Sequence, residues 1–284
     1  MVFYNKIMIY ILYYSGEIPS YANQCIDAIK SVDPNSKIYF LGDKGFTNEK
    51  TFYIDIKDLK YKSLTTKLDK LDYYKNQDNY LWKSSLYRLF YINSLIEEFS
   101  INNFIHFDLD VLIYKSFDEI KHVFKPNKIN ITPGNESNII LGYCYVDEKK
   151  IFNELCDLIL EILNNSKYFE ERYFNNHTLN EMELLNIACI EKPELFSLLK
   201  TVPNNDNLVF DANSYGQYIG GIPDKMFSKK FINPSHYSGR SMLKHGYKPE
   251  YNKGKPVIVF NKSNHELVNL HIHKKSLIKY APNV

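Results

Sequence analysis

Strand-like and helix-like segments alternate along the first 114 residues of this chain. Apolar side chains recur at helical spacing in Ile18–Val32 and Leu81–Phe99, which predicts two helices. Strands that alternate with helices are typical of a mostly parallel sheet with helices on its faces. The sequence therefore predicts an α/β fold with a Rossmann-like central sheet, in which ligands bind beyond the carboxyl ends of the strands. The predicted strands are Lys6–Tyr14, Lys37–Gly42, Thr51–Ile56 and Phe104–Tyr114.

The rest of the chain is less regular. The stretch Asn204–Tyr247 contains several glycines and little periodicity, and we interpret it as a long functional loop. No low-complexity linker divides the sequence, so we expect residues 1–284 to form one domain. Predicted strands in this part are Lys128–Thr132, Ile139–Val146, Pro256–Phe260 and Leu267–His273, and predicted helices are Phe152–Asn164 and Glu181–Ile190.

Charge and cysteine usage restrict the function classes. The formal net charge is only +2, from 35 basic and 33 acidic residues, so the chain lacks the basic excess of a nucleic-acid binder. Four scattered cysteines without a C-x-x-C pair predict free thiols in a reducing compartment. The N-terminus lacks the features of a signal peptide, and no apolar run reaches membrane-spanning length. We expect a cytoplasmic protein whose contact with membranes, if any, is peripheral.

Two carboxylates follow each other closely in the predicted strand Phe104–Tyr114. Asp108 and Asp110 are two residues apart, a spacing that puts side chains on the same side of a strand. Two carboxylates at a buried strand end are costly unless a positive group lies beside them. Carboxylate oxygens suit Mg²⁺ or Mn²⁺, which bind through one or two carboxylates and substrate phosphates. A solvated strand end without a metal is the alternative.

A second polar cluster lies near the C-terminus. His271 and His273 alternate with apolar residues, so both imidazoles should face one side, and Lys274 and Lys275 follow at once. Imidazole is a metal ligand, and lysine provides a point charge for a diphosphate. We favour His273 as the ligand because it lies nearest the strand end, with His271 orienting it. A pair of surface histidines before a basic tail remains the simpler alternative.

Three further positions stand out. Arg88 lies on the predicted helix just before the carboxylates and could pair with them, although a surface arginine fits the pattern as well. Glu181 stands at a helix start, where the helix dipole alone favours an acidic residue. Asp211 lies in a glycine-rich stretch with Gln217, where glycines allow close approach to a ligand.

This set of features resembles the metal-dependent nucleotide-sugar glycosyltransferases of the GT-A fold. The features are an alternating first half, an Arg-bearing helix, His-Phe-Asp-Leu-Asp at 106–110, Gly-Gln-Tyr-Ile-Gly-Gly at 216–221 and His-Ile-His-Lys-Lys at 271–275. The chain is most similar in these motifs to the small enzymes of large algal viruses and of bacterial surface-polysaccharide clusters, and more distantly to glycogenin-like enzymes. A viral member would work in the host cytoplasm.

The resemblance implies a UDP-sugar donor, a glycan or other hydroxyl acceptor and a Mn²⁺ or Mg²⁺ ion. It makes residues 1–115 the nucleotide-binding half and residues 116–284 the acceptor half. The metal would be held by Asp108, Asp110 and either His273 or His271. The transferred sugar would be a hexose or a deoxyhexose, and retention of its anomeric configuration is favoured by the glycogenin-like likeness alone.

The remaining site residues follow from the same resemblance. Asp108 would also touch the ribose, Tyr13 would cradle the base, and Arg88, Gly142 and Lys275 would contact the donor or its phosphates. The catalytic candidates are Asp211 and Glu181, either of which could serve as base in an inverting enzyme. Related enzymes carry Gln after the acidic residue at position 181, and Met182 replaces it here.

Three alternative functions remain open at this point. A sugar-phosphate nucleotidyltransferase shares the fold type, but it calls for a glycine-rich phosphate loop after the first strand, where this chain has Ser15-Gly16-Glu17. A metallohydrolase could use His271 and His273 as a zinc-binding pair, given further ligands elsewhere. A non-catalytic sugar-nucleotide-binding module would keep the fold without turnover.

Overall fold

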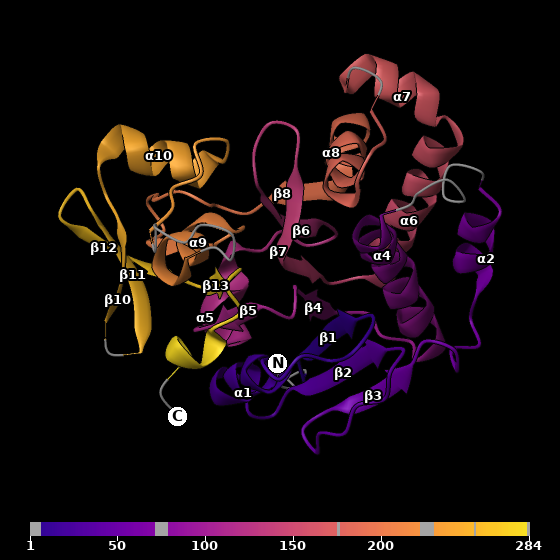
Figure 1. The fold of residues 1–284 in the computed structure, drawn as a ribbon, viewed down its shortest axis with the longest axis horizontal. Coiled ribbons are helices and arrows are strands. Elements are labelled where there is room, and N and C mark those ends of the chain that lie inside the picture. The colour runs from indigo at the N-terminus through magenta and orange to yellow at the C-terminus, as the bar shows by residue number, and fades with distance from the viewer. Residues whose placement is uncertain (1–6, 72–78, 175–176, 222–229, 253, 283–284) are drawn as a thin grey trace, which may run out of the picture.

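The computed structural model describes residues 7–71, 79–174, 177–221, 230–252 and 254–282. Figure 1 shows a central sheet with its helices and a smaller sheet unit to one side. The central sheet has seven strands in the order β3-β2-β1-β4-β7-β6-β8. These strands are β1 (Ile9–Tyr14), β2 (Lys37–Gly42), β3 (Phe52–Asp55), β4 (Phe104–His106), β6 (Ile129–Pro133), β7 (Ile139–Val146) and β8 (Phe196–Leu198).

The sheet is mostly parallel, as the alternating pattern predicts. Strands β3, β2, β1 and β4 pair in parallel, and β6 pairs in parallel with β8. Only β7 runs against its neighbours β4 and β6. The carboxyl ends of β1 and β4 therefore lie side by side, which is where the fold type places a ligand.

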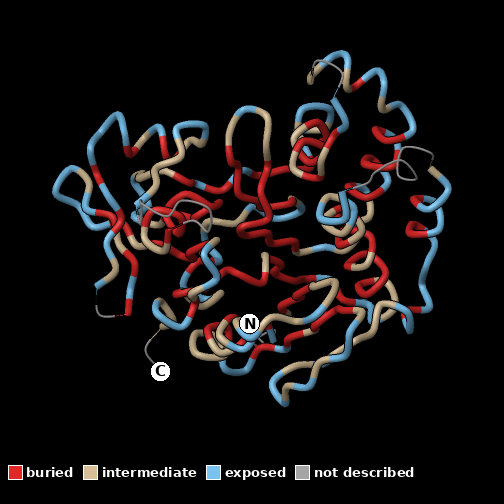
Figure 2. Tube along the Cα trace, viewed as in Figure 1, coloured by how far each residue is buried: buried red, intermediate tan, exposed pale blue. Residues whose placement is uncertain are grey.

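Helices cover both faces of this sheet, and β1 shows why. Its alternate side chains enter two separate cores: Ile11 packs with the helices on one face, and Tyr10 and Leu12 pack with α1 (Ala22–Val32) on the other. The first face holds α2 (Ser63–Asp69), α4 (Tyr80–Glu98), α6 (Lys149–Asn164) and α8 (Glu181–Glu191). Figure 2 shows the buried chain concentrated between these layers, with exposed chain at the periphery.

The predicted single strand Phe104–Tyr114 is wrong. The chain leaves the central sheet after β4, turns through 107–110 and begins β5 (Val111–Ile113) in a different sheet. The Val111 N–H donates to the Asp108 carbonyl at 3.1 Å, which closes the turn. β5 pairs antiparallel with β13 (Asn269–His271), so residues far apart in sequence meet here.

The remaining strands form a sheet in the order β10-β11-β12-β9. They are β9 (Leu208–Val209), β10 (Pro249–Asn252), β11 (Lys255–Phe260) and β12 (Ser263–Leu267). The stretch 204–247, expected as a loop, contains α9 (Ser214–Gly220) and α10 (Tyr237–His245) in its described parts, and 222–229 lie outside the described residues. The described residues also contain two further short α-helices, α5 (Phe117–Ile120) and α7 (Ser166–Tyr173), and short 3-10 helices at Lys121–Val123, Pro193–Leu195 and Leu277–Lys279.

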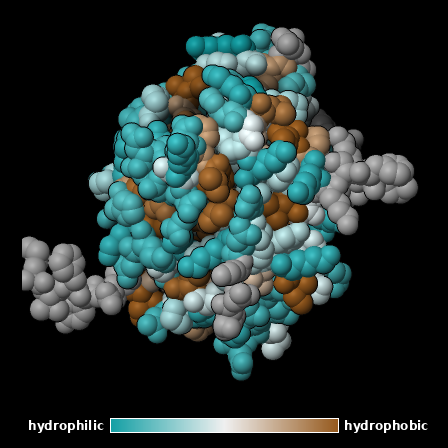
Figure 3. Space-filling model, turned by 90° about the vertical axis from the view of Figure 1, so that its left-hand side faces the viewer, coloured by the Kyte–Doolittle hydropathy of each residue, from teal (hydrophilic) through white to brown (hydrophobic). Residues whose placement is uncertain are grey.

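The outer face of the smaller sheet unit is mostly hydrophilic, with apolar residues in separate patches between polar ones (Figure 3). Within the described ranges, no helix has the length and apolar character that crossing a membrane would need.

Candidate active site

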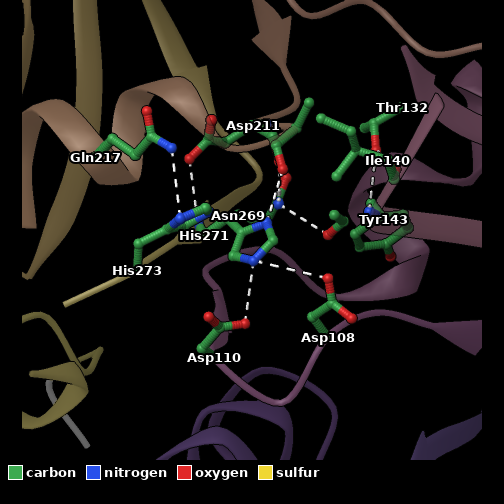
Figure 4. Close-up of polar contacts among 12 residues, drawn as sticks. Asp108, Asp110, Thr132, Ile140, Tyr143, Asp211, Gln217, Asn269, His271 and His273 are labelled. Atoms are coloured by element: carbon green, nitrogen blue, oxygen red, sulfur yellow. Dashed lines mark hydrogen bonds and ion pairs between the residues drawn. The ribbon is translucent and has the colours of Figure 1, made fainter. Parts of the chain in front are cut away.

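Asp108, Asp110 and His271 meet at the carboxyl end of β4. The turn after β4 carries both carboxylates. The β5–β13 ladder pairs His271 with Val111, the residue that follows Asp110 in the chain. His271 Nε2 lies 3.0 Å from Asp110 Oδ1 and 3.7 Å from Asp108 Oδ2. Figure 4 shows the imidazole facing both carboxylates. One ligand atom from each of the three residues lies within 4.8 Å of the others, as a shared cation requires.

The ring of His271 is fixed in one orientation. Its Nδ1 lies 2.7 Å from the Ala212 carbonyl oxygen. A carbonyl can only accept, so Nδ1 carries the proton and donates it, while Nε2 faces the carboxylates. Burial alone would lower the pKa of His271, but the neighbouring Asp110 carboxylate outweighs burial and raises it to about 9.

The preference for His273 as the metal ligand is not supported. His273 follows the end of β13, and its Nδ1 lies 3.4 Å from Gln217 Nε2, with its ring 4.6 Å from that of His271. The two imidazoles are close together, as their alternation predicts, but only His271 reaches the carboxylates. Burial and the nearby His271 charge lower the pKa of His273 to about 3, so this ring is neutral.

Two cationic side chains share the site with the carboxylates. Arg88, on α4, pairs with Asp108 and also with Glu181, from which it lies 2.9 Å. Lys275 pairs with Asp110 from the other side. Burial tends to raise the pKa of Asp110, but the His271 and Lys275 charges hold it well below its usual range. The predicted pairing of Arg88 with the acidic cluster is therefore present, and three carboxylates face three cationic groups.

A cleft of about 560 Å³ opens over this cluster. Its walls come from the carboxyl end of β1, the first turns of α4, the turn after β4, the start of α8 and the end of β13. Of the residues proposed from the sequence, the cleft is lined by Tyr13, Arg88, Asp108, Asp110, Glu181, His271, His273 and Lys275. Polar and aromatic side chains that the sequence analysis did not single out also line it: Tyr14, Ser15, Tyr21, Tyr80, Trp82 and Asn213.

Glu181 lines the cleft but is not free. It is the first residue of α8, 3% exposed, and its Oε1 accepts a hydrogen bond from Arg88. Burial raises the pKa of Glu181, and the Arg88 charge opposes that rise. Met182, the next residue, also lines the cleft.

Asp211 does not face the cleft, contrary to the role expected for it as a catalytic base. It is fully buried, and its carboxylate accepts backbone N–H groups of Tyr215, Gly216 and His271 at 2.9, 2.7 and 3.0 Å. A base must reach the acceptor hydroxyl, and these contacts leave Asp211 no access to it. Burial raises its pKa, and the three backbone N–H groups oppose that rise.

Gly142 is also outside the cleft. A Cβ at this position would lie 2.5 Å from the Ala212 oxygen and 2.7 Å from the Asp211 oxygen. Its missing side chain therefore admits the backbone of residues 211–212, and not a donor sugar.

Asn269 is a structural residue of the site that the sequence analysis missed. It is fully buried, its Oδ1 accepts from the Asp211 N–H at 3.0 Å, and its Nδ2 donates to the carbonyls of Asp211 and Gly142 at 2.8 and 3.1 Å. The sequence did contain a sign of this role, because alternation along the strand puts Asn269 on the same side as His271.

The donor set fits a hard divalent cation. Two carboxylates and one imidazole supply oxygen and nitrogen ligands of the kind that Mg²⁺ and Mn²⁺ accept, and the cleft leaves room for substrate oxygens. The two carboxylates are already balanced by Lys275, Arg88 and protonated His271. A divalent ion would therefore take over positive charge that these three side chains place beside the carboxylates.

Comparison with solved structures returns glycosyltransferases. Mouse xyloside xylosyltransferase 1 in its apo form is 11% identical, with 68% of this chain and 85% of that chain covered and a TM-score of 0.48. The galactosyltransferase LgtC, solved with donor and acceptor sugar analogues, is 12% identical, with 81% and 87% covered and a TM-score of 0.42. Apo GlyE of Streptococcus pneumoniae is 11% identical, with 75% and 48% covered and a TM-score of 0.42.

No family model and no curated protein matches the sequence. Each of the three solved structures is at most 12% identical to this chain and has a TM-score below 0.5.

Proposed function

We propose that this protein is a metal-dependent glycosyltransferase that moves a hexosyl or deoxyhexosyl group from a UDP-sugar to a hydroxyl of a glycan or other acceptor. The observation that carries the proposal is the meeting of Asp108, Asp110 and His271 beneath a cleft at the carboxyl ends of β1 and β4. A carboxylate pair with one imidazole favours Mn²⁺ or Mg²⁺, and such ions typically bind nucleotide phosphates. The sequence motifs add the expectation of a sugar nucleotide.

Each residue of the site would have its own role in binding the ion or the donor. Asp108, Asp110 and His271 would hold the ion, which supplies Lewis-acid stabilisation to the departing diphosphate. Lys275 lies at the same edge and would provide a cation for the phosphate oxygens once it leaves Asp110. Tyr13 lines the cleft at the carboxyl end of β1, where we place the base. Arg88 keeps Asp108 and Glu181 in position through two ion pairs.

We further propose that transfer proceeds with retention. The acidic residues that line the cleft, within the described chain, are Asp108, Asp110 and Glu181, and each is paired with a cationic side chain. None is free to act as the base that inversion needs. Proton NMR of the first product would identify its anomer, and an inverted product would assign the base role to Glu181.

We also propose that the chain acts as one unit in the cytoplasm, with residues 1–115 supplying most nucleotide contacts and residues 116–284 most acceptor contacts. All four cysteines are free thiols, which supports a reducing compartment.

The direct test is calorimetric titration of UDP into the protein with Mn²⁺ and with EDTA, followed by a screen of nucleotide sugars for hydrolysis. We expect UDP binding to need the ion, and one UDP-sugar to be turned over. Equal UDP affinity in EDTA would remove the metal from the proposal, and turnover of a sugar phosphate with a nucleoside triphosphate would favour a nucleotidyltransferase. Binding without turnover of any donor would indicate a non-catalytic module.

A further inference from the structure

Asp211 is a fully buried carboxylate that accepts hydrogen bonds from the backbone. It forms no ion pair with any residue that the structure describes, and all three of its hydrogen bonds come from backbone N–H groups. Two of the donors, Tyr215 and Gly216, lie in the first turn of α9, and the third is His271 on β13. One carboxylate therefore ties the start of a helix to the strand that carries the imidazole.

The backbone around Asp211 is packed tightly enough to transmit its position. A Cβ on Gly216 would lie 2.0 Å from the His271 carbonyl oxygen, so α9 and β13 touch through their main chains. Asn269 holds the N–H and the carbonyl of Asp211 from the other side. The next residue is Ala212, whose carbonyl accepts the Nδ1–H of His271.

Asp211 thus reaches His271 by two routes. Directly, its Oδ2 accepts the His271 N–H at 3.0 Å and fixes the backbone (Figure 4). Indirectly, its own placement sets the Ala212 carbonyl, which keeps the proton on Nδ1 and leaves Nε2 toward Asp108 and Asp110. Partners of a ligating histidine of this kind fix its tautomer, and their loss typically costs about 10- to 100-fold in metal affinity.

We infer that Asp211 is a positioning residue for the metal site: it holds His271, through the backbone and the Ala212 carbonyl, in the orientation and tautomer that bind a divalent cation. This role rests on the proposed metal site. Asp211 is not among the residues that line the cleft, and it would act on the ion only through His271.

The test compares Asp211→Asn with the matched control Asp33→Asn. Asp33 also accepts a backbone N–H, that of Phe117 at 3.0 Å, but it does not line the cleft. Mn²⁺ affinity would be measured by electron paramagnetic resonance of the free ion, and folding by thermal melts. We expect Asp211→Asn to remain folded and to bind Mn²⁺ at least about tenfold more weakly, because an amide cannot accept from all three N–H groups. Asp33→Asn should bind like the unmodified protein.

Folded Asp211→Asn with unchanged Mn²⁺ affinity would overturn the inference, as would an equal loss in the Asp33→Asn control. If the unmodified protein binds no Mn²⁺, the proposed metal site itself fails, which is a separate result. A second measurement does not depend on the variant folding. Nitrogen-15 NMR of the unmodified protein with saturating Mg²⁺ should show a neutral His271 ring with its proton on Nδ1, and a neutral ring with its proton on Nε2 would contradict the inference.

Discussion

His271 pairs with Val111 across the β5–β13 ladder, so the imidazole is placed beside Asp110 by backbone register. The Ile272 N–H continues the ladder by donating to the Asp110 carbonyl at 2.9 Å. The ladder thus fixes which of the two late histidines can reach the carboxylates. His273 lies beyond the last pair and packs beside Gln217.

We therefore expect substitutions of the two histidines to have different effects on Mn²⁺ binding. His271→Gln should weaken Mn²⁺ binding by at least about tenfold, since loss of a ligand costs no less than loss of its supporting partner. His273→Gln, the matched control, should change it little, because His273 is not among the three residues that share the site. Isothermal titration with Mn²⁺ checks both, and the reverse order of effects would restore His273 as the ligand.

Lys275 should compete with the metal ion. Its ammonium pairs with Asp110, so Lys275→Met should strengthen Mn²⁺ binding when no nucleotide is present. The same variant should weaken UDP binding in the presence of Mn²⁺, because a phosphate-binding cation is lost. Lys274→Met, an exposed neighbour, serves as control. Weaker Mn²⁺ binding in Lys275→Met would show that Lys275 supports the ion and does not compete with it.

Metal binding should depend on pH through His271. Its pKa of about 9 means that the ring is protonated at neutral pH in the ion-free protein, and a ligand imidazole must give up that proton. Apparent Mn²⁺ affinity should fall by up to about tenfold for each pH unit below about 9 and level off above it. Calorimetry in buffers of different ionisation enthalpy should detect about one proton released per ion. Affinity independent of pH would refute this assignment.

The stability of the ion-free protein should show the opposite trend at alkaline pH. A pKa raised from 6.5 to about 9 gives a stabilisation that is complete below pH 6.5 and is lost as pH rises through 9. The full shift corresponds to at most roughly 3 kcal/mol. Thermal melts in EDTA should therefore fall between about pH 6.5 and 9.5, and the fall should be smaller in His271→Gln. Equal slopes in both proteins would locate the alkaline loss elsewhere.

The contact between α9 and β13 should not tolerate a side chain. Gly216→Ala would place a Cβ 2.0 Å from the His271 oxygen, which forces the backbones apart and should cost roughly 1–3 kcal/mol or more. Mn²⁺ binding should weaken as well. Gly246→Ala is the control: its φ of 73° is strained for alanine, but nothing lies within 4 Å of the new Cβ and His271 is not involved. Unchanged Mn²⁺ affinity in a folded Gly216→Ala protein would contradict the packing argument.

Local sequence patterns predicted the helical and sheet layers of the fold, because apolar residues recur with different periods in helices and in strands. β1, β2 and β7 and the helices α4 and α6 follow directly from apolar spacing. The sequence also predicted a metal site made of two carboxylates and a histidine near the C-terminus. The prediction that one strand holds both carboxylates was wrong. Asp108 and Asp110 share a turn and not a strand, and they converge because that turn closes on itself.

Partners that are distant in sequence were beyond such patterns. No feature of residues 269–271 identifies residues 111–113 as their pairing strand. The spacing of the residues therefore could not decide whether His271 or His273 reaches the carboxylates. Asp211 was misread for a similar reason. A carboxylate among glycines looks like a catalytic group, but its partners are main-chain N–H groups that every sequence carries.

The β5–β13 ladder also has a consequence for the order of events during synthesis. A chain is made from its N-terminus, and domains begin to fold as they leave the ribosome. Asp108 and Asp110 are therefore made long before His271, and in that interval their strand β5 lacks its only ladder partner among the described strands. The nascent protein cannot assemble all three ligands until translation has passed β13. A product that ends after β8 but before β13 would carry all seven strands of the central sheet and both carboxylates, and it would lack the third ligand, His271.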